Sequence, residues 1–106
     1  MPAGNFLIVG KPFEGYWMVW QGYIDGWGSL GQEVRFSTRE DIVSSGYLEE
    51  ARRSADREEI ELNPICIAHI PLGQTNGIVY HNGSEVAVDF TDDDLSPRQM
   101  RELGVL

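Results

Sequence analysis

Carboxylates are the side chains of this 106-residue sequence that could most readily do chemistry. Residues 40–61 hold eight acids against three arginines, and residues 85–94 hold five acids and no base. Oxygen ligands suit Ca²⁺ or Mg²⁺, but the run of Asp92, Asp93 and Asp94 lacks the spacing and the central glycine of a calcium-binding loop. We therefore predict no metal site, and we expect the three aspartates to stabilise the start of the helix that follows.

Histidine and cysteine offer few further catalytic groups. Neither His69 nor His81 has a second histidine at the spacing of a zinc site. Cys66 lies in an apolar run, which predicts a buried and inert thiol. A single cysteine cannot form an internal disulfide, so we expect a reducing compartment and predict a cytoplasmic protein.

The sequence contains no motif for binding a nucleotide phosphate and no serine-nucleophile motif. We therefore predict that the chain is not an enzyme and that it takes no cofactor. A rival hypothesis is an enzyme that uses His81 with Glu85, Asp89 or Asp92. That enzyme would need these side chains to converge in a concave site.

The charge balance limits the class of partner. The net charge is −9, from 17 acidic and 8 basic residues. Binding to nucleic acid or to an anionic membrane requires clustered positive charge, so we predict no direct contact with either. We expect a partner protein with a basic surface, because complementary charge would steer it to this chain. The alternative is that the acidity serves solubility alone.

An aromatic segment provides the second candidate feature. Tyr16, Trp17, Trp20, Tyr23 and Trp27 lie within twelve residues, along a stretch that reads as a strand and the loop after it. Both faces of that strand are apolar, so one face can enter the core and the other must be covered or left open. An open face would bind a partner, because tryptophan and tyrosine dominate interface hot spots. The same pattern would fit a homodimer.

Six strands are expected before the last helix, with a glycine-rich loop over residues 25–32. The clearest signal is Asn82-Gly83 between two β-rich runs, which predicts a type I′ hairpin with His81 opposite Ser84 and Val79 opposite Val86. The expected strands comprise residues 5–9, 15–24, 34–36, 65–70, and the hairpin pair 77–81 and 84–90.

Two helical stretches complete the pattern. A helix is predicted from Ser37 or Thr38 to about Glu59, with a kink or a break into two helices at Gly46. A short C-terminal helix follows Ser96, which with Gln99 forms a capping box. The sequence therefore predicts a single α+β domain over residues 1–106. It would consist of an antiparallel or mixed sheet of about five to six strands, one main helix and a short C-terminal helix.

The leading functional hypothesis is a small acidic inhibitor that occupies the basic surface of a partner protein. Its profile is that of nucleic-acid mimics, such as the inhibitors that phages use against host defences. One rival is a small-ligand binding domain with a pocket lined by Trp20, Trp27 and Tyr80, and another is a structural subunit of a larger assembly. The predicted partner-binding residues are Trp17, Trp20, Tyr23, Trp27, Glu49, Glu50, Glu58, Glu59, Asp92, Asp93 and Asp94.

Overall fold

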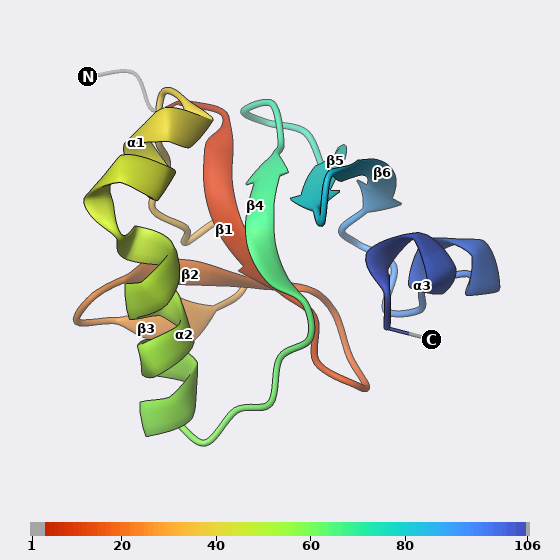
Figure 1. Ribbon diagram of the computed structural model, residues 1–106, viewed down its shortest axis with the longest axis horizontal. Coiled ribbons are helices and arrows are strands. Elements are labelled where there is room, and N and C mark those ends of the chain that lie inside the picture. Colours follow the sequence, from red (N-terminus) through yellow and green to blue (C-terminus); the bar gives the residue numbers. More distant parts are fainter. Residues whose placement is uncertain (1–3, 106) are drawn as a thin grey trace.

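The computed structural model describes residues 4–105 as one six-stranded sheet with three helices (Figure 1). The strands lie in the order β3-β2-β1-β4-β5-β6, and every neighbouring pair is antiparallel. This is the predicted α+β class. The elements are β1 (Phe6–Gly10), β2 (Met18–Gly22), β3 (Gly26–Gly28), α1 (Arg39–Ser45), α2 (Tyr47–Arg57), β4 (Ile65–His69), β5 (Asn76–His81), β6 (Ser84–Asp89) and α3 (Pro97–Leu103).

The β5–β6 hairpin has the predicted register, with His81 opposite Ser84 and Val79 opposite Val86. Asn82 and Gly83 both have positive φ angles, of 50° and 80°, as a type I′ turn requires. The two-residue turn fixes the pairing, so the local sequence alone determines which side chains share a face.

Both faces of the sheet are covered, by different helices. Figure 1 shows α1 and α2 following one another along one side of the molecule, with α3 at the opposite end beside β6. Alternate side chains of β1 enter two separate cores: Ile8 packs in a cluster with residues of α1 and α2, and Leu7 and Val9 pack in a cluster with Leu103 of α3. The sheet is therefore the central layer, and its central strands β1 and β4 are buried on both sides.

The helix ends follow the predicted capping residues. The Thr38 side chain accepts a hydrogen bond from the backbone N–H of Asp41, which begins α1. Gly46 has a φ angle of 78° and separates α1 from α2, so the predicted break is confirmed. Ser96 and Gln99 form the complete capping box of α3, and Gly104 ends that helix in the left-handed region.

Three predicted boundaries in the first third of the chain are wrong. The strand expected over residues 15–24 is shorter, because it begins only at Met18. The stretch expected as a glycine-rich loop contains β3, which pairs Trp27 with Trp20. Residues 34–36 form no regular strand, and a single bridge joins Phe36 to Phe6.

Candidate functional site

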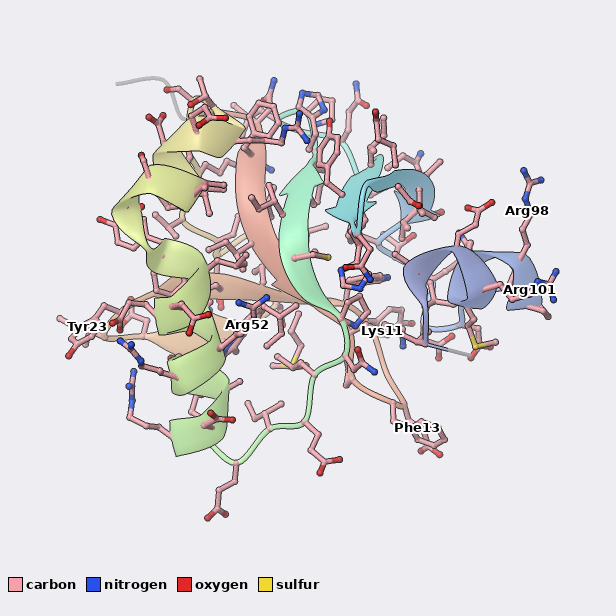
Figure 2. All side chains as sticks on the ribbon, viewed as in Figure 1. Lys11, Phe13, Tyr23, Arg52, Arg98 and Arg101 are labelled. Atoms are coloured by element: carbon pink, nitrogen blue, oxygen red, sulfur yellow. The ribbon has the colours of Figure 1, made fainter. Side chains whose placement is uncertain are left out.

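The three indoles predicted as partner anchors lie in the core. Trp17, Trp20 and Trp27 are 3%, 1% and 6% exposed, so the prediction that they present a binding platform is wrong for this fold. The reason is that helices cover both faces of the sheet, and each apolar face of β2 therefore enters a core. Of the four predicted aromatic anchors, only Tyr23 is exposed, at 66%, on the β2–β3 hairpin (Figure 2).

Trp27 joins β3 to α2. Its indole Nε1 donates a hydrogen bond to the backbone carbonyl of Ala51 at 2.9 Å, and its backbone N–H donates to the Glu58 carboxylate at 3.2 Å. Glu58, predicted as a partner-binding residue, therefore has a structural contact with β3. The sequence signal for this contact is weak, because it spans 31 residues of chain.

Two more of the predicted steering glutamates are paired within α2. Glu49 accepts a hydrogen bond from Arg52 at 2.9 Å and Glu50 accepts one from Arg53 at 2.8 Å. Both pairs are three residues apart along the helix. These side chains are largely exposed, so the pairs add little stability, but each arginine locally offsets one acid. Within α2, the acids Glu49, Glu50 and Asp56 are balanced by three arginines, so the helix itself carries no net charge.

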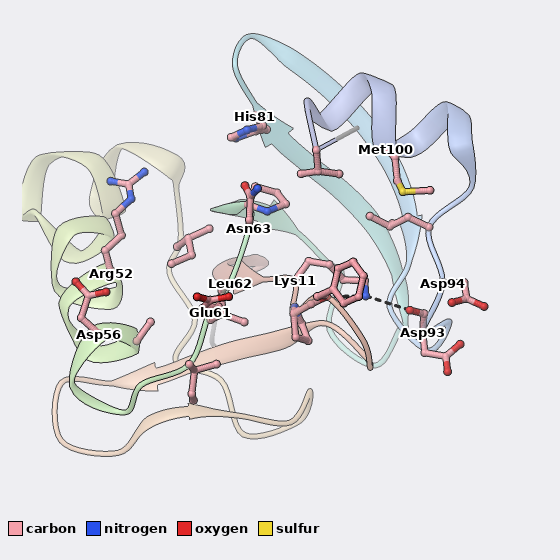
Figure 3. Close-up of a pocket in the computed structure, with 18 residues that line it drawn as sticks. Lys11, Arg52, Asp56, Glu61, Leu62, Asn63, His81, Asp93, Asp94 and Met100 are labelled. Carbon is pink, nitrogen blue, oxygen red and sulfur yellow. Dashed lines mark hydrogen bonds between the residues drawn. The ribbon is translucent and has the colours of Figure 1, made fainter.

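A groove of about 960 Å³ lies at the end of the sheet where β1 and β5 finish and β4 begins. Figure 3 shows Arg52 and Asp56 on one side of the segment that carries Glu61, Leu62 and Asn63, and Lys11, Asp93 and Met100 on the other. Segments far apart in the chain thus form one concave surface. It is lined by Lys11, Pro12, Phe13, Arg52, Ala55, Asp56, Ile60, Glu61, Leu62, Asn63, Pro64, Ile65, His81, Asp93, Asp94, Leu95, Met100 and Val105.

The charges of this groove are mainly negative. Among its described lining residues, Asp56, Glu61, Asp93 and Asp94 are the acids, and Lys11 and Arg52 are the formal cations. Two of the three predicted partner-binding aspartates, Asp93 and Asp94, therefore lie at the groove, together with two acids that the sequence did not single out. The structure does not place Asp92 in the lining, nor Glu49, Glu50, Glu58 or Glu59.

Lys11 holds three of the segments that line the groove. Its ammonium donates to the backbone carbonyls of Pro12, Gly15 and Asp93 at 3.0, 2.7 and 3.0 Å. Its backbone N–H donates to the carbonyl of Pro64, and its own carbonyl accepts from the N–H of Asn63. Lys11 therefore links the loop after β1, the segment before β4 and the loop after β6.

Burial also changes the ionisation of Lys11, which is only 6% exposed. Burial lowers the pKa of Lys11 below its ordinary value, and the carboxylates of Asp94 and Asp93 act in the opposite direction. Lysine is rarely this buried without hydrogen-bonded partners. Lys11 is the only lysine in the sequence. That was the one sequence signal that could have pointed to its role in holding the loops together, and the predictions from the sequence do not draw on it.

The residues of the rival enzyme hypothesis do not form one described site. His81 lines the groove, but Glu85, Asp89 and Asp92 are not among the lining residues. The Asp89 carboxylate accepts hydrogen bonds from the side chain and the backbone N–H of Thr91, and these lower the pKa of Asp89. Within residues 4–105, no three histidine, cysteine or acidic side chains are grouped so that they could hold a metal ion.

Cys66 is buried in β4, as the sequence predicts. Burial raises the pKa of the Cys66 thiol to about 12, although the charge of Arg52 acts in the opposite direction. A thiol with such a pKa is almost entirely protonated at neutral pH, and the thiolate is the nucleophilic form. Cys66 is therefore a packing residue.

A second hollow, of about 570 Å³, lies on the α3 side of the sheet and is more apolar. Its lining includes Tyr16, Trp17, Leu30 and Phe90, and the rings of Trp17 and Phe90 meet edge to face at 5.5 Å. The residues that were predicted to line a ligand pocket do not line the groove or this second hollow. Its residues Trp20, Trp27 and Tyr80 pack instead in the core beneath α1 and α2.

Comparison of the chain with protein-family models, with curated proteins and with solved structures finds no match. No helix in the part of the chain that the structure describes is long and apolar enough to cross a bilayer.

The fold and the groove define the class of the molecule. It is an α+β domain with a two-sided sheet and an acidic concave surface at one end of that sheet.

Proposed function

We propose that this chain is a small cytoplasmic binding protein that inhibits a partner by occupying the partner's basic surface. One observation carries the proposal: the groove gathers four carboxylates around an apolar floor. Such a surface complements a protein that carries positive charge beside apolar side chains. The aromatic strand plays no part in this proposal, because its indoles are buried.

Charge elsewhere on the molecule supports the same class of partner. The net charge of −9 gives the whole chain a negative field. Figure 2 shows Arg98 and Arg101 of α3 projecting away from the sheet, and Arg98 is paired with Glu102 at 3.1 Å. The positive side chains of α3 therefore do not offset the acids of the groove, whose lining they do not join.

The test is affinity capture followed by an activity measurement. The protein is immobilised, a cytoplasmic extract is passed over it, and the bound fraction is eluted with a salt gradient. We expect a basic protein to elute at moderate salt, because charge pairs at the rim of an interface are screened by ions. If that protein binds nucleic acid, the purified chain should compete with a DNA or RNA oligonucleotide for it.

A column that carries an unrelated acidic protein of equal net charge is the control. Proteins that elute from both columns at the same salt concentration are bound by ion exchange alone. Capture of nothing beyond those proteins, or of a partner that keeps its nucleic-acid binding and its activity when saturated, would contradict the inhibitor function.

A second candidate function is the binding of a small apolar ligand in the hollow beside Trp17. The observation that favours it is that the hollow is mainly apolar and is lined by the rings of Trp17 and Phe90. An apolar ligand that filled the hollow would displace water from the Trp17 indole, which is favourable. A fragment screen that monitors the ¹⁵N–¹H signal of this indole tests the idea, and an unmoved signal throughout would reject it.

A further inference from the structure

We infer that the groove binds an extended segment of the partner in which arginine or lysine alternates with large apolar side chains. This inference rests on the proposed function and specifies the chemistry of the bound segment. It is carried by the way apolar and acidic residues are distributed over the groove.

The floor of the groove is apolar and accessible. Leu62, Ile65, Leu95, Met100 and Val105 line it, and all five are only partly buried. Apolar surface of this kind is stabilised when another apolar side chain displaces its water. Phe13 extends the apolar surface at the margin, because its side chain is 96% exposed on the loop after β1 (Figure 2).

The negative charge lies on both sides of the groove and on the segment between them. Asp56 comes from α2 and Glu61 from the segment after it, whereas Asp93 and Asp94 belong to the loop before α3 (Figure 3). Acids from two separate parts of the chain therefore line a surface with an apolar floor. A segment that places basic side chains against these acids and apolar side chains on the floor satisfies both the charged and the apolar parts of the groove.

The two cations offset these four acids only in part. Arg52 donates to Glu49 at 2.9 Å, so its charge is already paired outside the groove. The ammonium of Lys11 donates to three backbone carbonyls, and its charge acts on Asp94 and Asp93 on its own side of the groove. The carboxylates of Asp56 and Glu61 show no side-chain hydrogen bond within the described residues, which leaves them free to pair with a cation.

Other classes of ligand satisfy only part of this surface. Nucleic acid would place phosphates against four carboxylates, which repel them. A polyamine would satisfy the carboxylates, but it would leave the apolar floor in contact with water. A segment that combines both side-chain types is therefore the ligand that the geometry selects.

The experiment uses the whole ¹⁵N-labelled chain and four defined probes. The first probe is a capped hexapeptide in which arginine alternates with leucine. The others are its counterpart with glutamate in place of arginine, a hexa-arginine peptide, and spermine. We expect the arginine–leucine peptide to shift the backbone amide signals of the groove residues and to bind most tightly, and the glutamate–leucine peptide not to bind.

A matched pair of double variants locates the contact. Asp56→Asn with Glu61→Gln removes two charges from the groove, and Glu40→Gln with Glu59→Gln removes two charges from residues outside its lining. The groove variant should bind the arginine–leucine peptide about three- to tenfold more weakly, whereas the outer variant should change the affinity less than about twofold. Both variants replace exposed side chains, so each should stay folded.

Several results would overturn the inference. One is that the arginine–leucine peptide at millimolar concentration shifts no backbone amide signals, or shifts only signals outside the groove. Another is that hexa-arginine or spermine binds as tightly as this peptide. A third is that the two double variants lose the same amount of affinity for it. The inference and the proposed function can fail separately. A captured basic partner whose affinity is unchanged by the groove variant would keep the proposed function and remove this site. A peptide that binds in the groove, without any basic partner in the extract, would keep this site and remove the proposed function.

Discussion

Lys11 shows how one buried side chain organises the groove. Moving an ammonium out of water is unfavourable unless its hydrogen bonds are replaced, and here three carbonyls replace them. Two of these carbonyls belong to the loop that carries Phe13, and the third belongs to the loop that carries the acids of one wall. The position of that wall relative to the loop after β1 therefore depends on one residue.

Lys11 should resist chemical modification in the folded protein. An acylating reagent needs an accessible neutral amine, and all the N–H groups of this ammonium have acceptors. Peptide mapping after brief acetylation should find Lys11 unmodified in buffer and fully modified in concentrated urea. If Lys11 reacts in buffer as fast as a free lysine, the ammonium does not hold the loops together.

Glu33 and Arg35 form a second organising pair away from the groove. Their side chains are only 6% and 7% exposed, and Arg35 Nε donates to Glu33 at 2.7 Å. Burial alone would raise the pKa of Glu33. Hydrogen bonds from the backbone N–H groups of Glu33 and Gly31 and from Arg35 outweigh it, so the pKa of Glu33 lies below its ordinary value of 4.5. Arg35 also donates to the carbonyl of Ile70, which fixes this segment to the end of β4.

A lowered carboxyl pKa in the folded state predicts a pH-dependent loss of stability. The contribution of Glu33 should be complete well above pH 4.5 and should disappear as the pH falls through its folded pKa, because protonation then removes the charge. Glu33→Gln should lower the free energy of unfolding by about 1–3 kcal/mol at neutral pH. Urea denaturation at neutral pH and at acidic pH measures both effects, and the difference between the two proteins should narrow as the pH falls.

The surface pair of Arg98 and Glu102 provides the control, because its side chains are 84% and 40% exposed. Glu102→Gln should change the free energy of unfolding by less than about 0.5 kcal/mol at either pH. A loss from Glu33→Gln that persists unchanged at low pH would assign the effect to packing rather than to charge.

At the scale of elements, the contact between β3 and α2 decides how the edge of the sheet is covered. β3 has only three residues, which is too short to be stable by its own pairing. The hydrogen bond from Trp27 to the carbonyl of Ala51 and the contact of the Trp27 N–H with Glu58 attach it to the helix. β3 therefore depends on α2, although a sequence reading treats the two independently.

Substitution of two tryptophans by phenylalanine separates this hydrogen bond from packing. Trp20 and Trp27 are both buried, but the Trp20 Nε1 has no partner among the described residues. Trp27→Phe should therefore cost about 1 kcal/mol more of the free energy of unfolding than Trp20→Phe. Chemical denaturation of both variants measures the difference. Equal losses would mean that the bond to Ala51 contributes nothing beyond ring volume.

At the scale of the whole molecule, excess negative charge opposes folding. Seventeen acids and eight bases are brought into a domain whose radius of gyration is 12.6 Å. The exposed ion pairs, such as those of Arg52 and Arg53 with neighbouring glutamates, offset little of that repulsion. Folding therefore places like charges closer together than they are in the unfolded chain.

Screening should consequently stabilise the fold. Raising sodium chloride from about 10 mM to physiological ionic strength shortens the Debye length from about 30 Å to about 8 Å, which is less than the width of the molecule. The midpoint of thermal unfolding, measured by circular dichroism, should rise by a few degrees. Potassium chloride should give the same rise, since the effect depends on ionic strength. A falling midpoint would mean that favourable ion pairs dominate over repulsion.

The sequence by itself determined the features that depend on local interactions. The Asn82-Gly83 turn, the caps at Thr38 and Ser96 and the break at Gly46 each involve residues a few positions apart, so the pattern alone predicts them. The same holds for the α+β class and for the buried Cys66. Charge composition indicated a class of partner, which stays a prediction.

Only the tertiary structure decided where the apolar faces and the groove lie. An aromatic strand with two apolar faces fits a core and an interface equally well, and the helices that cover both faces of the sheet buried Trp17, Trp20 and Trp27. The groove and the bonds of Lys11 join segments as much as 82 residues apart. Such contacts arise from the packing of whole elements and have no local pattern, which is why the sequence did not reveal them.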